Sequence, residues 1–371
     1  MGFFGKLFGG GSNLGDLELR VIERQLEDVT AQVIECRGLL PVYSRKNIGL
    51  VTSILCDNDE GELAPVISML DFCQEEGTSA YQSIYEIGQV EGPGGYEDWA
   101  SIAMFYPEML QPSMGGKQTL YAFVRLVDMN DMPSITLGFS ARSESIWTGQ
   151  VAHPHHFENK GYKEEQEDID EARALSIHLG VAVALVDDDF DDREGETLNK
   201  WIKNIISPFS NDKKEELKKL YNKALKDSYQ LDKSGKLNIE KICKKMNKIA
   251  DAAQKHEALE LVNMVMAADT KILESETKLI NRISSLLEID PAESEKIRDK
   301  QLVNLKPTSG AVNVESLLGI DPTWSNSKII THLAKEYTKW NGRMNSLSEG
   351  EEKDNAQQML DLIGETRKKY V

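Results

Sequence analysis

Two stretches of the chain, IHLGVAVALVDDDFDDRE at residues 177–194 and LELVNMVMAADTKILESE at residues 259–276, share one pattern at an offset of 82 residues. Each begins with an apolar run at helical spacing and continues with an Asp, an apolar residue three positions later and a Glu seven positions later. The apolar spacing predicts a helix, and the Glu falls where the first turn of a second helix is expected. The pattern therefore predicts two helix-loop-helix repeats.

The acidic residues of both repeats are candidate metal ligands: Asp187, Asp189, Asp191 and Glu194 in the first, Asp269 and Glu276 in the second. Carboxylate oxygens suit a hard cation such as Ca²⁺ or Mg²⁺, and a cation relieves the repulsion between crowded carboxylates. Packing of the repeats about a pseudo-two-fold axis would bring the outer Asp and Glu of each repeat together. Helix caps and a solvated acidic loop explain the same residues, so both interpretations stay open.

An EF-hand does not fit the first repeat. Counted from Asp187, the glycine that such a loop requires falls on Asp192, and its bidentate glutamate falls on Leu198. The first repeat is therefore not expected to be an EF-hand.

The doubled motif resembles the tellurite-resistance TerB family, whose repeats usually read Ala-Ala-Asp-Gly-x-Φ-x-x-x-Glu. The stretches 185–194 and 266–276 match this pattern, although Asp188 and Thr270 stand where the family prefers Gly. The resemblance covers residues 170–300. It implies an all-helical domain, acidic metal-binding sites and a role in tellurite or metalloid, oxidative or phage stress.

A second resemblance lies in residues 313–371, which are similar to the scaffold of a J-domain in an order like that of DjlA-type co-chaperones. Trp324, Tyr337 and Trp340 are its candidate residues for docking a protein partner. A working J-domain carries His-Pro-Asp after its second helix to engage the Hsp70 chaperone, whereas residues 341–343 here read Asn-Gly-Arg. The resemblance therefore implies a degenerate docking module that does not stimulate Hsp70.

The region before the repeats alternates between apolar and polar side chains, as around Leu17 and Leu19. A period of two predicts β-strands, and stretches 48–56 and 120–127 are apolar on both faces, as central strands are. Turn-forming residues separate these strands, so we expect an antiparallel β-sandwich. Its acidic turns resemble the calcium loops of C2-like domains, but acidic turns are common, so solvated loops are the first interpretation.

Together these patterns predict an α+β multidomain chain. Its expected parts are a flexible apolar and Gly-rich tail at 1–16, a β-sandwich at 17–150, an acidic linker at 151–169, a TerB-like helical domain at 170–305 and a J-like helical domain at 313–371. The histidines of the stretch 153–156 fall in the expected linker. A surface loop is their first interpretation, and a zinc site is the alternative.

The N-terminal tail places four large apolar side chains, Phe3, Phe4, Leu7 and Phe8, ahead of a Gly-rich linker. Such side chains on a flexible segment could enter a membrane interface or a partner's groove, whereas a disordered tail is the simpler interpretation. No apolar run reaches the roughly 20 residues that span a bilayer, and no secretory signal is recognisable. We expect a cytoplasmic protein, with peripheral contact at the inner membrane as the alternative.

The charge of the chain is −18, and its net negative charge lies within residues 1–200. Residues 1–160 hold 22 acids and 10 bases, and residues 161–200 hold 13 and 4. This disfavours nucleic-acid binding and favours divalent cations and basic partners. Residues 203–255 hold 14 lysines and 7 acids, which predicts either a solvated helix face or pairing with the acids of 161–200.

Signatures of catalysis are incomplete throughout the sequence, because no P-loop, nucleophile elbow or dinucleotide fingerprint is present. We therefore expect a non-catalytic stress-response protein that binds a divalent cation and serves as a scaffold for protein partners. A membrane-surface adaptor or co-chaperone-like protein is one alternative. A metal-dependent hydrolase is another, because carboxylates and a metal can activate water.

Overall fold

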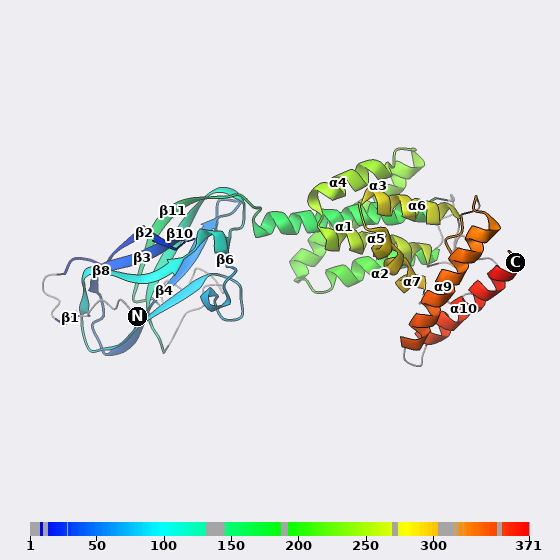
Figure 1. Cartoon of the computed structure of the whole chain (residues 1–371). Helices are drawn as coiled ribbons and strands as arrows, with labels where there is room; N and C mark the ends of the chain where they lie inside the picture. The colour runs from blue at the N-terminus through cyan, green and yellow to red at the C-terminus, as the bar shows by residue number, and fades with distance from the viewer. Residues whose placement is uncertain are drawn as a thin grey trace. The chain divides into compact units, whose positions relative to one another are not determined.

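A computed structural model describes residues 8–9, 14–27, 29–130, 145–186, 192–268, 274–302, 315, 318–321, 323–346 and 351–370. The chain divides into two compact units, Met1–Gln166 and Glu167–Val371. The first unit is built of strands and the second of helices (Figure 1). An α+β architecture with an antiparallel sheet region followed by a helical region is thus confirmed.

The first unit contains two main antiparallel sheets. One has the order β1-β8-β3-β2, formed by β1 (Phe8–Gly9), β8 (Gly94–Phe105), β3 (Val29–Leu40) and β2 (Glu18–Leu26). The other has the order β11-β10-β4-β5, formed by β11 (Trp147–Phe157), β10 (Gly116–Asp128), β4 (Lys46–Asp57) and β5 (Leu63–Pro65), with β7 (Gln82–Val90) also paired to β4. The short strands β6 (Ile67–Ser68) and β9 (Leu110–Gln111) form a third pair.

One hydrophobic core joins the two main sheets, as expected of a sandwich. Ile34 of β3 belongs to the same buried cluster as Leu50 of β4 and Val124 of β10. The central parts of β4 and β10 are buried almost without interruption, which confirms that the apolar stretches 48–56 and 120–127 are central strands. Apolar side chains on both faces favour that position because both faces are removed from water.

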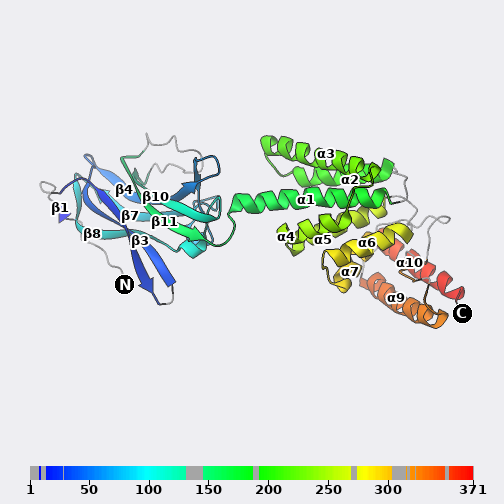
Figure 2. The ribbon, with the colours of Figure 1, turned by 90° about the horizontal axis from the view of Figure 1, so that it is seen from above.

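The second unit is helical. Its helices are α1 (Tyr162–Ala184), which begins in the first unit, α2 (Asp192–Ile206), α3 (Asn211–Lys233), α4 (Ile239–Ile249), α5 (Ala252–Met266), α6 (Glu274–Leu286), α7 (Pro291–Leu302), α9 (Asn326–Ser346) and α10 (Glu351–Lys368). One buried cluster extends from Ala172 to Ile363 and includes residues of α9 and α10, which lie side by side (Figures 1 and 2). The predicted boundary between helical domains at 305–313 lies outside the described residues.

The helix ends reproduce the repeat found in the sequence. Helix α1 ends at Ala184 and α5 ends at Met266, 82 residues later. Helix α2 begins at Asp192 and α6 begins at Glu274, again 82 residues later. Because α3 follows α2 and α7 follows α6, each repeat comprises three helices.

The segment 151–169 differs from the acidic linker that the sequence predicted. Strand β11 continues to Phe157, and α1 begins at Tyr162. Alternate residues from Val151 to Phe157 face inward, so this segment obeys the strand period despite its histidines. Acids such as Glu164 and Glu165 occupy the first turn of α1, where the positive end of the helix dipole stabilises them.

Two further elements are more regular than expected. Helix α9 continues to Ser346, so residues 341–343 are helical and do not form the loop that follows a J-domain's second helix. Within the expected tail, Phe8–Gly9 pairs with Gly94–Gly95 as strand β1. A backbone hydrogen bond also joins the Leu39 amide to the Gly15 carbonyl at 2.9 Å.

Candidate functional site

Glu194 and Glu276 occupy equivalent places in the two repeats. Each is the third residue of its helix, α2 or α6, and each is only 4% exposed. A buried carboxylate requires a hydrogen-bonding or cationic partner, and both glutamates have interactions within the chain. Their position in a first helical turn also favours the negative charge. Two buried carboxylates are thus held at matching places by the fold.

The other predicted ligands, Asp187, Asp189, Asp191 and Asp269, lie outside the described residues. The non-glycine positions Asp188 and Thr270 lie outside them as well. Within the part of the chain that is described, no group of three or more His, Cys, Asp or Glu side chains is arranged to hold a metal ion. The candidate site is therefore represented by its two glutamates, whose carboxylate chemistry suits a hard cation.

Gly180 of α1 marks the contact of three helices that border the acidic loops. A Cβ atom at this position would lie 2.8 Å from Leu198 Cδ2 of α2 and 3.6 Å from Leu261 of α5. Gly180 lies four residues before the end of α1, Leu261 five before the end of α5, and Leu198 six after the start of α2. Each of these helix ends borders an acidic loop. At a rise of about 1.5 Å per residue, those ends lie about 6–9 Å along the axes from the shared contact. The close approach thus brings the ends next to both loops into one region.

Two lysines of the lysine-rich segment pair with acids near the middle of α1. Lys213 lies 2.9 Å from the buried Asp170, and Lys245 pairs with Glu171. Burial acts to lower the pKa of Lys213, but hydrogen bonds to Glu216 and Asp170 raise it overall. For these two lysines, the interpretation of pairing within the helical unit is therefore confirmed.

The three predicted docking residues differ in exposure. Tyr337 is 46% exposed, whereas Trp340 is 1% exposed and belongs to the core. Trp324 is half-buried and packs edge-to-face on His332, with ring centroids 5.2 Å apart. Of the three, Tyr337 presents the most surface to a partner.

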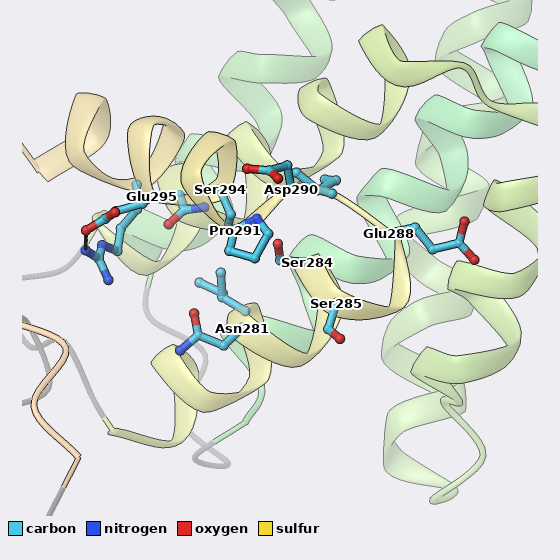
Figure 3. A pocket seen from close by; sticks show the side chains of 12 residues that line it. Asn281, Ser284, Ser285, Glu288, Asp290, Pro291, Ser294 and Glu295 are labelled. Atoms are coloured by element: carbon cyan, nitrogen blue, oxygen red, sulfur yellow. Dashed lines mark ion pairs between the residues drawn. The ribbon is translucent and has the colours of Figure 1, made fainter. Parts of the chain in front are cut away.

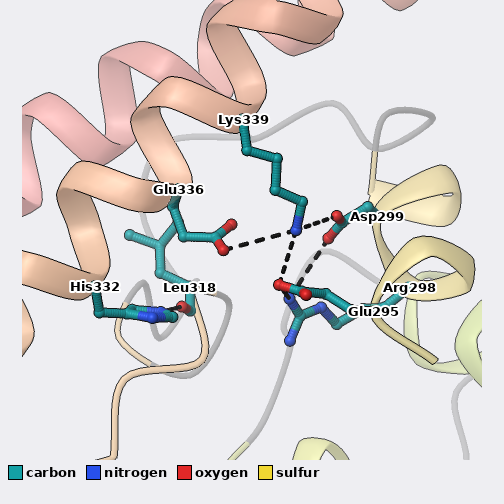
Figure 4. Close-up of polar contacts among 7 residues, drawn as sticks. All are labelled: Glu295, Arg298, Asp299, Leu318, His332, Glu336 and Lys339. Carbon is teal, nitrogen blue, oxygen red and sulfur yellow. Dashed lines mark hydrogen bonds and ion pairs between the residues drawn. The ribbon is translucent and has the colours of Figure 1, made fainter. Parts of the chain in front are cut away.

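A buried charge cluster joins α7 to α9 (Figure 4). Lys339 pairs with Asp299, lies 2.8 Å from Glu295 and lies 3.6 Å from Glu336. Asp299 and Glu336 are 1% and 5% exposed. Burial raises the pKa of Glu336, whereas the hydrogen bond from Lys339 lowers the pKa of Glu295. This cluster was not predicted from the sequence, although its charges lie at the i,i+3 and i,i+4 spacings that share a helix face.

The second repeat also contains a pocket of about 730 Å³ that the sequence analysis missed. It is lined by Asn263 of α5, by Ile280, Asn281, Ser284 and Ser285 of α6, by Glu288, Ile289 and Asp290 of the connection, and by Pro291, Ser294, Glu295 and Arg298 of α7. Asn281 and Ser284 face the start of α7 across it, whereas Glu288 points away (Figure 3). The sequence feature that could have indicated this pocket was Asn263, a polar residue at a buried position of the repeat.

The histidines at 153–156 lie on β11 rather than on a loop. His153 and His155 stack with ring centroids 6.3 Å apart, and His155 contacts Phe157 at 4.7 Å. Burial lowers the pKa of both histidines. The rings are thus part of the packing at the sandwich edge, which neither the surface-loop nor the zinc interpretation anticipated.

The N-terminal apolar residues Phe3, Phe4 and Leu7 lie outside the described residues, and Phe8 is part of β1. Among the helices of the described chain, none combines the length and the apolar character needed to cross a bilayer.

The two repeats match a known protein family. Residues 173–299 match the family described as Tellurite resistance protein TerB. The match spans both repeats from α1 to α7 and confirms the TerB-like part of the resemblance. No curated protein and no solved structure matches the chain. The match is consistent with a tellurite-resistance-related protein.

Proposed function

We propose that this protein is a non-catalytic scaffold of the tellurite or metalloid, oxidative or phage stress response, in which the two repeats share one divalent cation. The cation would be Ca²⁺ or Mg²⁺, and its ligands would come from the acidic loops and from Glu194 and Glu276. By bridging the repeats it would fix the angle between their helix pairs. The sandwich and the C-terminal hairpin, formed by α9 and α10, would then present surfaces to protein partners.

The observation that carries this proposal is the pair of buried glutamates at matching positions. Glu194 and Glu276 are each 4% exposed, although the first turn of a helix is usually well solvated. Both carboxylates have interactions within the chain that compensate their burial, so they are held at matching positions beside the two acidic loops. The contact at Gly180 further supports the proposal because it gathers helix ends that border both loops.

Calorimetric titration of the full chain with Ca²⁺ and with Mg²⁺ tests the proposal. Asp187→Ala and Asp269→Ala should each weaken binding at least about tenfold, because affinity at oxygen-ligand sites depends on the number of charged ligands. Glu196→Gln is the matched control, since Glu196 is an exposed acid on the same helix as Glu194. It should bind as the wild type does.

Circular dichroism of each variant shows whether the helices are retained, so that loss of binding is not confused with unfolding. If the two Asp variants fold and bind the cations as the wild type does, the shared site does not exist. Equal weakening in Glu196→Gln would mean that only general acidity attracts the cation.

A further inference from the structure

The two repeats form two matched grooves. The groove of α1, α2 and α3 has a volume of about 340 Å³, and the groove of α5, α6 and α7 has about 730 Å³. Three lining positions correspond at the 82-residue offset of the repeat: Val181 with Asn263, Leu198 with Ile280, and Asn199 with Asn281. The first groove therefore serves as an internal reference for the second.

The main difference at the buried positions is Asn263, which is 1% exposed and replaces the valine of the first repeat. Its side-chain Nδ2 donates to the Leu259 carbonyl at 2.7 Å. Because a carbonyl can only accept, this bond fixes the amide orientation and directs Oδ1 elsewhere. Oδ1 is buried without a hydrogen-bond partner among the described residues. Such an orphaned acceptor is rare in a folded protein and points to a missing donor.

The surrounding side chains indicate the chemistry of that donor. Three carboxylates line the groove against one guanidinium, and Arg298 already pairs with Glu295 at 3.7 Å and with Asp299 at 3.5 Å. The remaining acids are Glu288, which points away from the pocket, and Asp290, whose Oδ1 caps the Ala292 amide. Asp290 therefore remains as the lining carboxylate without an ion pair among the described residues, and it adds a negative charge to the acceptors of the groove.

Hydroxyl and apolar groups complete the lining. Ser284, Ser285 and Ser294 supply hydroxyls, while Ile280 and Ile289 supply apolar surface. A ligand that suits this lining carries N–H donors and positive charge on a short aliphatic body. A phosphate or carboxylate ligand would face repulsion from the acids.

We propose that the groove of the second repeat binds a small aliphatic amine, which donates an N–H to Asn263 Oδ1 and contacts Asp290 and the serine hydroxyls. The first groove has a valine in place of this asparagine and does not bind amines. This inference is independent of the proposed cation site, because the lining of the groove includes neither Glu194 nor Glu276.

Titration calorimetry of the full chain with spermidine tests this inference. The wild type should bind one spermidine, and Asn263→Val, which copies the first repeat, should weaken binding at least tenfold. Asn199→Ala, in the first groove, is the matched control and should leave the affinity unchanged. Asn263→Val should keep the wild-type unfolding midpoint or exceed it, because the orphaned carbonyl is removed.

Three results would overturn the inference. They are failure of spermidine to bind the wild type, equal affinity of Asn263→Val and the wild type, and binding of the neutral polyol sorbitol in place of spermidine. The double variant Asp187→Ala/Asp269→Ala separates this site from the acidic loops. It should bind spermidine normally even if it loses Ca²⁺, and loss of spermidine binding in it would assign the amine to the loops instead.

Discussion

Replacement of Lys339 by methionine tests whether the buried charge cluster holds the C-terminal hairpin to the rest of the helical unit. Lys339 is on α9, and it pairs with Asp299 and Glu295 of α7. Methionine keeps most of the aliphatic length but removes the charge. Asp299, at 1% exposure, and Glu336, at 5%, would then lose their shared ammonium group.

The expected cost follows from this geometry. Removal of one partner from a buried ion pair usually costs about 3–5 kcal/mol. Arg298 stays 3.5 Å from Asp299, and the Lys339 side chain is 27% exposed, so the lower end applies. We expect a loss of about 3 kcal/mol. For a unit of this size the midpoint should fall by about 6–12 °C, at about 2–4 °C per kcal/mol.

Thermal and urea unfolding followed by circular dichroism of the helical signal measure this loss. Lys335→Met is the matched control, because Lys335 is exposed on the same helix, and it should change stability by less than about 0.5 kcal/mol. Adding Glu336→Gln to Lys339→Met should recover part of the loss, since one buried carboxylate is then neutral. Equal stability of Lys339→Met and the control, or separate melting of α9 and α10 in the wild type, would show that the cluster does not hold these helices in place.

Four further outcomes are expected. Burial raises the pKa of Glu336 in the folded protein. The contribution of Glu336 to stability is therefore fully present below the usual Glu pKa of about 4.3 and is lost as pH rises through the pKa of the folded state. Glu336→Gln should show a smaller decline in unfolding free energy between about pH 4 and pH 7 than the wild type does. Gly161→Ala should destabilise the sandwich by about 1–3 kcal/mol in urea unfolding, because its Cβ would lie 2.3 Å from the Ser113 carbonyl oxygen. Gly364→Ala on α10 should instead stabilise by about 0.5–1 kcal/mol, because nothing lies within 4 Å; a loss of stability there would contradict the packing. Cys73, which is half-buried, should react with a thiol reagent before unfolding, and early reaction of any of the three buried thiols would contradict the fold: Cys36, Cys56 and Cys243.

The helical repeats could be predicted from the sequence because their signals are local and doubled. Apolar spacing fixed the helix faces, and the paired Asp and Glu positions marked where one helix ends and the next begins. The helix ends of α1, α2, α5 and α6 then follow the same 82-residue offset. The alternation around stretches 48–56 and 120–127 identified central strands for the same reason.

The linker prediction differed from the structure because residue type outweighed spacing. Histidines and a proline at 153–156 are typical of loops, yet the alternation from Val151 to Phe157 is that of a strand. The acids after Gly161 are typical of a solvated segment, yet Glu164 accepts hydrogen bonds from the Gly115 and Gly161 amides at 2.7 and 2.8 Å. These backbone donors hold the pKa of Glu164 below its usual value.

The groove and the charge cluster could not be predicted because they depend on contacts between distant segments. Asn263 by itself does not differ from other helical asparagines. Alignment of the two repeats shows that Val181 occupies the equivalent position. Lysine and aspartate usually lie at the surface, whereas packing of α9 on α7 buries Asp299 and most of the Lys339 side chain. Such pairings are long-range, and a single sequence carries little information about them.

The number of divalent cations bound per chain decides whether the two repeats share one site. Equilibrium dialysis of the full chain against Ca²⁺ should give one bound ion, because two repeats contribute ligands to one site. The same ion should be lost in both Asp187→Ala and Asp269→Ala. Binding of no ion, or of two ions that each survive loss of the other repeat's aspartate, would contradict a shared site.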